Sequence, residues 1–225
     1  MIETRNLTKS FKNGDIVTQV LRGIDFKAKE GDFVAIMGRS GAGKSTFLYQ
    51  ISLLDEPTSG EIFIDGREAH AMSEAEKARF RLVKFGYVFQ DYALMPELTA
   101  FENVLIPLMM MDYADEKARR QAETALERVG MGKRFGNLPS QLSGGEQQRV
   151  SIARAIADKP AVLFADEPTA NLDRESSDTV MELFMELHKE GQTIIMVTHE
   201  EEYAKLSDTV VQLDEGRIVN MQARG

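Results

Sequence analysis

The chain has 225 residues, of which 43% are hydrophobic and 28% are charged, proportions that are ordinary for globular proteins and exclude disordered and fibrous classes. The formal net charge of −9 disfavours nucleic acid as a partner, and the lack of cysteine excludes disulfides and thiolate-bound metals. The length predicts one large domain, residues 1–225, or a core that carries a sizeable insertion.

Membrane-spanning and secretory segments are not expected. The longest apolar run, residues 104–111, contains a proline and is far shorter than the about 20 residues that a spanning helix needs. Residues 1–5 do not begin an apolar secretory core. We therefore expect a soluble protein of a reducing, cytosolic compartment.

The first third of the chain predicts several strands and two helices. Strands are expected over residues 2–7, 20–28, 33–37, 61–64 and 85–89, and the continuous apolar run at 33–37 indicates a strand buried on both faces. A helix is expected over residues 44–54. Ser73 and Glu76 predict a capping box at the start of a second, charged helix.

Residues 91–158 differ in character, because helix signals follow one another without a strand between them. Thr99 with Glu102 begins one predicted helix, residues 115–129 form another, and Ser143 with Glu146 begins a third. We expect an inserted helical subdomain over residues 91–158, with residues 1–90 and 159–225 forming the core.

Strands and helices alternate again in the last third. Strands are predicted over residues 161–165 and 193–197, a helix over 174–190, and a hairpin over 208–213 and 217–221. Alternating strands and helices predict an α/β fold with a mainly parallel sheet core and helices on both faces, and the hairpin adds an antiparallel β part.

A glycine-rich segment between the strand at 33–37 and the following helix has the spacing of a phosphate-binding P-loop. Its glycines allow successive backbone N–H groups to point at phosphate oxygens, and the helix start adds a positive dipole end. Lys44 would pair with β and γ phosphates, and the Ser45 hydroxyl would ligate Mg²⁺. The local alternative is a purely structural loop. The predicted nucleotide-binding residues are Gly38, Arg39, Ser40, Gly41, Ala42, Gly43, Lys44, Ser45 and Thr46.

Two carboxylates, Asp166 and Glu167, follow the buried strand at 161–165. Open α/β sheets bind their ligands at such strand ends. We predict that Asp166 helps to hold Mg²⁺ and that Glu167 polarises the attacking water. The local alternative is that the two acids only cap a helix.

Residues 142–149 read Leu-Ser-Gly-Gly-Glu-Gln-Gln-Arg. A capping box explains Ser143 and Glu146 but not the two glycines between them. The segment resembles the signature motif that separates ABC ATPases from other P-loop nucleotide hydrolases. The resemblance identifies Ser143, Gly144, Gly145 and Glu146 as nucleotide-binding residues, on a slim helix start suited to an anion.

Other positions resemble ABC motifs along nearly the whole chain. Gln90 is similar to the Q-loop glutamine, which in the family reaches Mg²⁺ and the attacking water, and residues 171–173 are similar to the D-loop. His199 is similar to the switch histidine that contacts the γ-phosphate. Phe11 stands where the family often has an aromatic residue stacked on adenine, although a core aromatic is the alternative.

The resemblance narrows to one subgroup through residues 98–108 and 166–173. That subgroup contains macrolide-export, lipoprotein-releasing and cell-division ATPases. The sequence departs from its pattern at Arg39, where proline is common, and over residues 47–52.

The resemblance implies an ATPase that uses ATP and Mg²⁺. Glu167, His199 and Gln90 would be catalytic, and Ser45, Gln90 and Asp166 would hold the metal. It further implies a composite site, in which ATP on the P-loop of one subunit is covered by residues 143–146 of a second copy in a head-to-tail dimer.

The implied membrane partner is a separate transmembrane permease, which would place the chain at the cytoplasmic face of the cell membrane as a peripheral subunit. In the family the permease docks beside the Q-loop, here residues 90–96 and the helical segment that follows. The methionines at 109–111 would join that surface or fill the core.

Three functions follow as hypotheses. The first is the ATPase subunit of an ABC transporter of efflux or lipoprotein-release type. The second is a soluble ABC protein of DNA repair or translation, whose coiled-coil insertion or second cassette is missing here. The third is an ATP-dependent regulator of the cell envelope, of cell-division type, that transports nothing.

Overall fold

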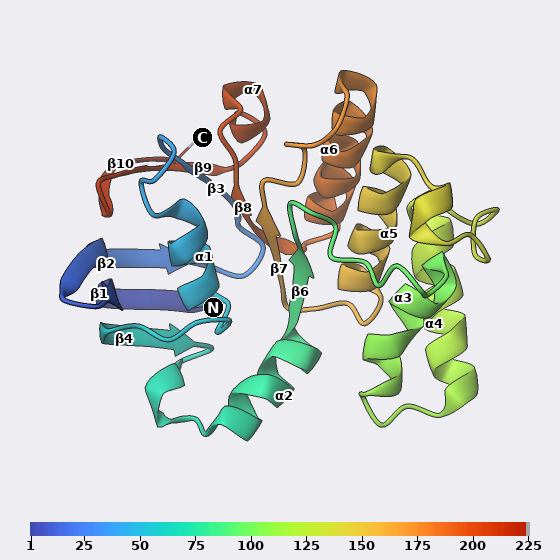
Figure 1. Cartoon of the computed structure of the whole chain (residues 1–225), viewed down its shortest axis with the longest axis horizontal. Coiled ribbons are helices and arrows are strands. Elements are labelled where there is room, and N and C mark those ends of the chain that lie inside the picture. Colours follow the sequence, from blue (N-terminus) through green and yellow to red (C-terminus); the bar gives the residue numbers. More distant parts are fainter. Residues whose placement is uncertain (224–225) are drawn as a thin grey trace. The chain divides into compact units, whose positions relative to one another are not determined.

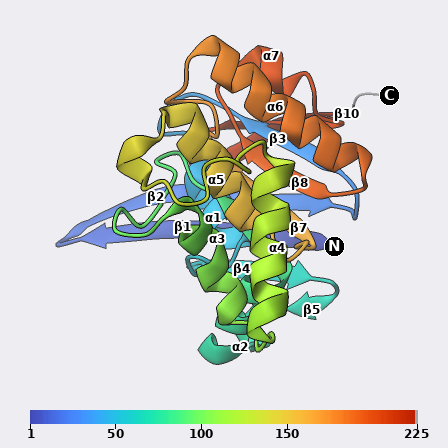
Figure 2. The same cartoon turned by 90° about the vertical axis from the view of Figure 1, so that its right-hand side faces the viewer.

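The structure of the chain is a computed structural model that describes residues 1–223. It contains two compact units, drawn in Figures 1 and 2. The first unit comprises residues 1–81 together with those from 191 onward, and the second comprises residues 82–190. Each unit mixes strands with helices, so the predicted α/β fold is confirmed. The predicted limits of a helical subdomain, 91 and 158, stay a prediction.

The first unit contains an antiparallel sheet whose strands lie in the order β2-β1-β4-β5. These strands are β1 (Ile2–Asn13), β2 (Ile16–Ala28), β4 (Ser59–Ile64) and β5 (Arg67–Glu68). β1 extends six residues beyond its predicted end. None of those residues is buried, the last three are exposed, and the extension passes through register shifts against β2. A strand with both faces in water lacks the alternating pattern from which strands are predicted.

The first unit also holds four strands in the order β10-β9-β3-β8. β3 (Phe33–Met37) pairs in parallel with β8 (Thr193–Val197) on one side and with β9 (Thr209–Asp214) on the other. β9 and β10 (Arg217–Ala223) form the predicted hairpin. The apolar residues of β3 and β8 are almost completely buried, as expected for strands covered on both faces.

Three helices accompany these strands: α1 (Lys44–Ile51), α2 (Glu74–Lys84) and the short α7 (Glu201–Ala204). α1 ends before the predicted residue 54, because Leu53 has a left-handed backbone with φ of 60°. α2 begins with the predicted capping box, in which Ser73 and Glu76 hydrogen-bond each other. A 3-10 turn, η1 (Ala69–Ala71), precedes α2.

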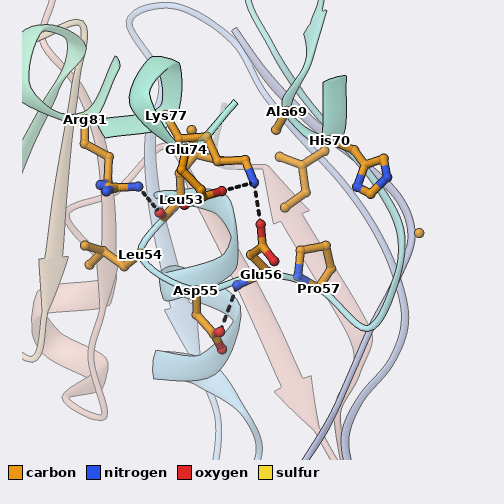
Figure 3. A pocket seen from close by; sticks show the side chains of 12 residues that line it. Leu53, Leu54, Asp55, Glu56, Pro57, Ala69, His70, Glu74, Lys77 and Arg81 are labelled. Atoms are coloured by element: carbon orange, nitrogen blue, oxygen red, sulfur yellow. Dashed lines mark hydrogen bonds and ion pairs between the residues drawn. The ribbon is translucent and has the colours of Figure 1, made fainter. Parts of the chain in front are cut away.

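Helix α2 is tied to the segment that follows α1, across a cavity of about 180 Å³ (Figure 3). The Lys77 ammonium, which is largely buried, donates to carboxylates of Glu56 and Glu74. These two partners, Glu56 first, raise the pKa of Lys77. Arg81 donates to the carbonyl of Leu53 at 2.8 Å. These contacts of Lys77 and Arg81 hold the loop after α1 against α2.

The second unit pairs two parallel strands, β6 (Phe85–Val88) and β7 (Val162–Asp166), and adds four helices. The helices are α3 (Ala100–Met109), α4 (Asp115–Arg128), α5 (Gly144–Ile156) and α6 (Arg174–Lys189). Helices α3, α4 and α5 pack against one another, with α4 alongside α3 in Figure 2. Residues 91–159 contain no strand, and capping boxes begin α3 and α5, as predicted. A 3-10 turn, η2 (Pro139–Gln141), precedes α5.

Aromatic packing holds the strand pair of the second unit together. Phe164, completely buried in β7, meets the ring of Phe85 edge-on with centroids 5.0 Å apart, and stacks at 6.2 Å on Tyr87. Both partners come from β6, whose residues pair directly with those of β7.

We predict that Phe164→Ala lowers the free energy of unfolding by about 3–5 kcal/mol, because it leaves a cavity in a core that cannot collapse around it. Phe11→Ala is the matched control, since Phe11 is 48% exposed, and it should cost far less. Urea denaturation followed by circular dichroism measures both. Equal losses in the two variants would contradict the assigned core.

Candidate active site

The predicted phosphate loop, residues 38–45, connects β3 to α1 in the first unit. Gly43 is the N-cap of α1 with a left-handed φ of 97°, a conformation that glycine adopts without strain. Gly43 packs against β2. A Cβ on Gly43 would stand 3.0 Å from a methyl group of Leu21 and 3.1 Å from the carbonyl oxygen of Val20. A side chain there would be tightly placed, and it would also have to adopt the positive φ. The loop is closed by the Ala42 N–H donating to the carbonyl of Arg39.

The start of α1 differs from the starts of α3, α5 and α6. Those three helices begin with Thr99, Ser143 and Asp173, whose side chains accept a hydrogen bond from the first turn. Gly43 supplies no such acceptor, and the first turn of α1 carries no acidic residue. Lys44 is buried at the same helix start. A helix start without an acidic cap, beside an ammonium, favours an anion such as phosphate.

His199 lies at the same edge of the sheet as the phosphate loop. β3 and β8 are parallel neighbours, with Ile36 opposite Val197, so both chains leave the sheet at their carboxyl ends. The Thr198 N–H still donates to the Ile36 carbonyl at 3.1 Å, which extends the pairing to the residue before His199. His199 itself is exposed. The first unit therefore brings the phosphate loop and the predicted switch histidine together at one edge.

Phe11 is not a core residue, so that alternative is wrong. The ring is 48% exposed on β1, and the Lys9 ammonium lies 5.1 Å from its centroid. Lys9 is held by Asp55 at 2.7 Å. The exposed ring of Phe11 is accessible for stacking on adenine.

The second unit brings Gln90, Asp166 and Glu167 to one edge in the same way. β6 and β7 are parallel, with Val88 opposite Ala165. Asp166 is the last residue of β7, Glu167 follows it, and Gln90 lies two residues after the end of β6. Asp166 is 5% exposed, and Gln90 is exposed. Glu167 has a left-handed φ of 47°, a costly conformation for a residue with a Cβ that is typical of functional sites. The N-cap of α6 is Asp173, so the alternative that Asp166 and Glu167 only cap a helix is wrong.

The signature segment, residues 143–146, forms the start of α5. The Ser143 hydroxyl accepts from the Glu146 N–H, and the Ser143 N–H donates to the Glu146 carboxylate at 2.9 Å. That backbone hydrogen bond is the main cause that lowers the pKa of Glu146, with Arg134 adding its charge at 3.2 Å. Ser143 remains exposed. Ser143 and Glu146 thus form a capping box, and the start of α5 is still accessible to a ligand.

The two glycines of the signature segment lie close to neighbouring side chains. A Cβ on Gly145 would stand 2.5 Å from the Ser176 hydroxyl and 2.8 Å from the Ser176 Cβ, which lies at the start of α6. A Cβ on Gly144 would stand 2.9 Å from the Tyr92 hydroxyl. The glycines therefore let α5 approach both α6 and the loop after Gln90.

Sequence reasoning missed Tyr92 and Arg154, which lie between these motifs. Arg154 on α5 donates to backbone carbonyls of Tyr92 and Ala93. Asn171 of the predicted D-loop donates to the Gln90 carbonyl at 3.2 Å. In the sequence, Arg154 cannot be told apart from any other polar residue of an amphipathic helix. The left-handed backbone at Tyr92 and Ala93 could not be predicted either, because the residues that commonly indicate it, glycine and asparagine, are absent there.

The methionines after α3 are not core residues. Met109 and Met110 are 58% and 64% exposed. The alternative that they fill the core is therefore wrong for these two, and they remain available to a partner.

Comparisons with known proteins point to one family. A protein-family model described as ABC transporter matches residues 21–170. The lipoprotein-releasing system ATP-binding protein LolD of Aquifex aeolicus is 45% identical over 89% of this chain and 90% of its own length. The macrolide export ATP-binding/permease protein MacB of Marinobacter nauticus is 44% identical over 97% of this chain, which spans 34% of that protein.

A solved structure is similar over its whole length. The ATP-binding cassette MJ0796, in a dimeric post-hydrolysis state bound to ADP and Pi, superposes with a TM-score of 0.93 at 39% identity, with 100% of both chains covered. LolD and MacB match the subgroup that the sequence resembles.

We predict that Gly145→Ala destabilises the chain by about 1–3 kcal/mol, because Ser176 and α6 have to shift. The higher helix propensity of alanine offsets only part of that cost. Gly136→Ala is the control, since a Cβ there meets nothing within 4 Å, and it should change stability by less than about 0.5 kcal/mol. Thermal unfolding of both variants checks this, and a stabilised Gly145→Ala would contradict the assigned contact.

Proposed function

The chain belongs to the ABC transporter family as an ATP-binding, ATP-hydrolysing subunit, and we propose that two copies close head to tail around ATP to drive a separate membrane permease. The observation that carries this proposal is the signature segment itself. It combines an exposed Ser143, two glycines on which a Cβ would stand within 3 Å of neighbouring side chains, and a helix start. The dimeric state of the similar cassette MJ0796 supports the same arrangement.

In the proposed site the phosphate loop binds the triphosphate. The α1 start directs N–H groups and a dipole end at the phosphates, and the Lys44 ammonium neutralises charge on the β and γ groups. The flanking residues Arg39, Ser40, Gly41, Ala42 and Thr46 belong to the same loop and helix start. Phe11 stacks on the adenine. The ADP and Pi bound by MJ0796 support a nucleotide at this loop.

Mg²⁺ fits the oxygen donors that the chain offers. Mg²⁺ prefers a few oxygen ligands, commonly one carboxylate, alongside waters and substrate phosphates. The Asp166 carboxylate, the Ser45 hydroxyl and the Gln90 amide oxygen are donors of that kind. These residues would hold the ion, which would neutralise charge on the phosphates.

Hydrolysis uses groups at the carboxyl ends of the two pairs of parallel strands. Glu167 accepts a proton from the attacking water as general base, and Gln90 orients that water. His199 contacts the γ-phosphate and stabilises the charge that develops there. The signature segment of the second copy supplies a further anion-binding helix start on the opposite side of the nucleotide.

A membrane partner completes the proposal. Within residues 1–223 no helix is both long and apolar enough to cross a bilayer. LolD is named as the ATP-binding protein of a releasing system, and MacB carries its permease in the same chain. We place the chain at the cytoplasmic face of the membrane, with the permease docked at residues 90–96 and at the exposed Met109 and Met110.

Glu167→Gln should slow ATP hydrolysis by roughly 10²–10⁴-fold with ATP affinity unchanged, because the amide keeps the size of the side chain but not its basicity. The ATP-bound dimer should then accumulate, which size-exclusion chromatography with Mg-ATP detects. Glu182→Gln, an exposed change on α6, should leave both properties as they are. Wild-type turnover by Glu167→Gln would exclude Glu167 as the base.

Ser143→Arg separates a composite site from a site complete within one chain. The bulky cation should block the signature segment from approaching the partner's nucleotide, so turnover and ATP-dependent dimerisation should fail while ATP binding through Lys44 persists. Ser143→Ala removes the helix cap without adding bulk, and so measures the contribution of the cap alone.

Mixing provides the complementary test. Ser143→Arg subunits combined with Lys44→Ala subunits can form at most one intact composite site per heterodimer, so part of the activity should return. Full hydrolysis by Ser143→Arg as a monomer, or loss of its ATP binding, would overturn the composite site.

A further inference from the structure

The loop that follows Gln90 has an unusual backbone. Tyr92 and Ala93 have φ of 60° and 49°, so two successive residues with side chains adopt the left-handed conformation. Such residues are disfavoured and persist where their surroundings hold them. The Tyr92 N–H donates to the Phe89 carbonyl at 3.2 Å, which closes the turn. Ala93 is exposed, so its side chain contributes little to holding this shape.

Arg154 is the main group that holds the loop. From α5, its guanidinium donates to the carbonyl of Tyr92 at 2.9 Å and to that of Ala93, and it also reaches the Ser151 hydroxyl at 3.3 Å. Burial lowers the pKa of Arg154. Arg154 is half-buried, and a charge-assisted fork that is partly removed from water binds two carbonyls more strongly than a fully exposed one.

Two further contacts connect the same loop to the predicted D-loop and to the signature segment. The Asn171 amide donates to the Gln90 carbonyl at 3.2 Å and to the Asp91 carboxylate at 3.3 Å. The Tyr92 hydroxyl donates to the Asn171 carbonyl at 3.4 Å and lies against Gly144. The loop after Gln90 is therefore in contact with both segments.

We propose that Arg154 is a positioning residue, which holds Tyr92 and Ala93 in the left-handed conformation so that Gln90 and the signature segment keep their places during ATP turnover. Tyr92 transmits the position of this loop to Gly144. The inference rests on the proposed roles of Gln90 and residues 143–146.

Hydrogen exchange of residues 89–95, without nucleotide, tests the holding role directly. Arg154→Lys keeps the charge but replaces a fork by one point donor, so exchange in this segment should rise by about tenfold or more. Arg128→Lys is the matched control, because Arg128 pairs with Glu190 at 2.6 Å elsewhere in the same unit, and exchange at 89–95 should not change.

Substitutions of the exposed Ala93 test the backbone without touching α5. Ala93→Val should speed exchange as Arg154→Lys does, because a β-branched residue resists positive φ. Asn tolerates that conformation, so Ala93→Asn combined with Arg154→Lys should return exchange toward the wild-type rate. Ala93→Val keeps the test valid if Arg154→Lys fails to fold.

Turnover decides the second half of the proposal. In Arg154→Lys and Ala93→Val, kcat should fall about tenfold while the ATP dissociation constant stays unchanged, and Ala93→Asn should restore kcat together with exchange. Unchanged exchange in both variants would overturn the holding role, and faster exchange with unchanged kcat would overturn its link to turnover. A wild-type chain without ATP hydrolysis would instead refute the proposed function, and the exchange results would still decide the role of Arg154.

Discussion

Parallel pairing constrains where neighbouring strands end, and the candidate site depends on this constraint in both units. Strand β3 leads into the phosphate loop and its parallel neighbour β8 leads to His199. In the second unit, β6 leads to Gln90 and its parallel neighbour β7 leads to Asp166 and Glu167. Each of these residues lies at the carboxyl end of a strand or within two residues of it, where the regular hydrogen bonds of the sheet give way to irregular backbone.

Much of this arrangement could be predicted because its signals are local. Continuous apolar runs marked β3 and β8, whose limits agree with the structure, and paired Ser or Thr with Glu marked the starts of α2, α3 and α5. The phosphate loop and the signature segment were recognisable from glycine spacing, since glycine is needed wherever backbone approaches closely. Parallel pairing then accounts for the shared strand ends.

The remaining features depend on contacts between distant segments. The exposed end of β1 has no alternation to detect, and the strained backbone at Tyr92 and Ala93 carries no glycine. Arg154 matters because of carbonyls about 60 residues away in sequence, which no spacing rule connects to it. Whether Phe11, Met109 and Met110 are exposed likewise depends on how the rest of the chain packs around them. From the sequence alone, each could be a core residue or a residue that faces a ligand or partner.

The carboxylates that cap the helices of the second unit make its helix starts sensitive to acid. Hydrogen bonds from backbone N–H groups lower the pKa values of Glu102, Glu146 and Asp173. Because a lowered pKa stabilises the fold above the ordinary value and loses that effect as pH falls through the shifted one, the carboxylate hydrogen bonds at the starts of α3, α5 and α6 weaken over the same acidic range. The Thr99 and Ser143 hydroxyls keep their own cap hydrogen bonds. Helix α1 begins at Gly43 without any carboxylate. Acidification would therefore loosen the signature segment while leaving the phosphate loop's own helix start unaffected.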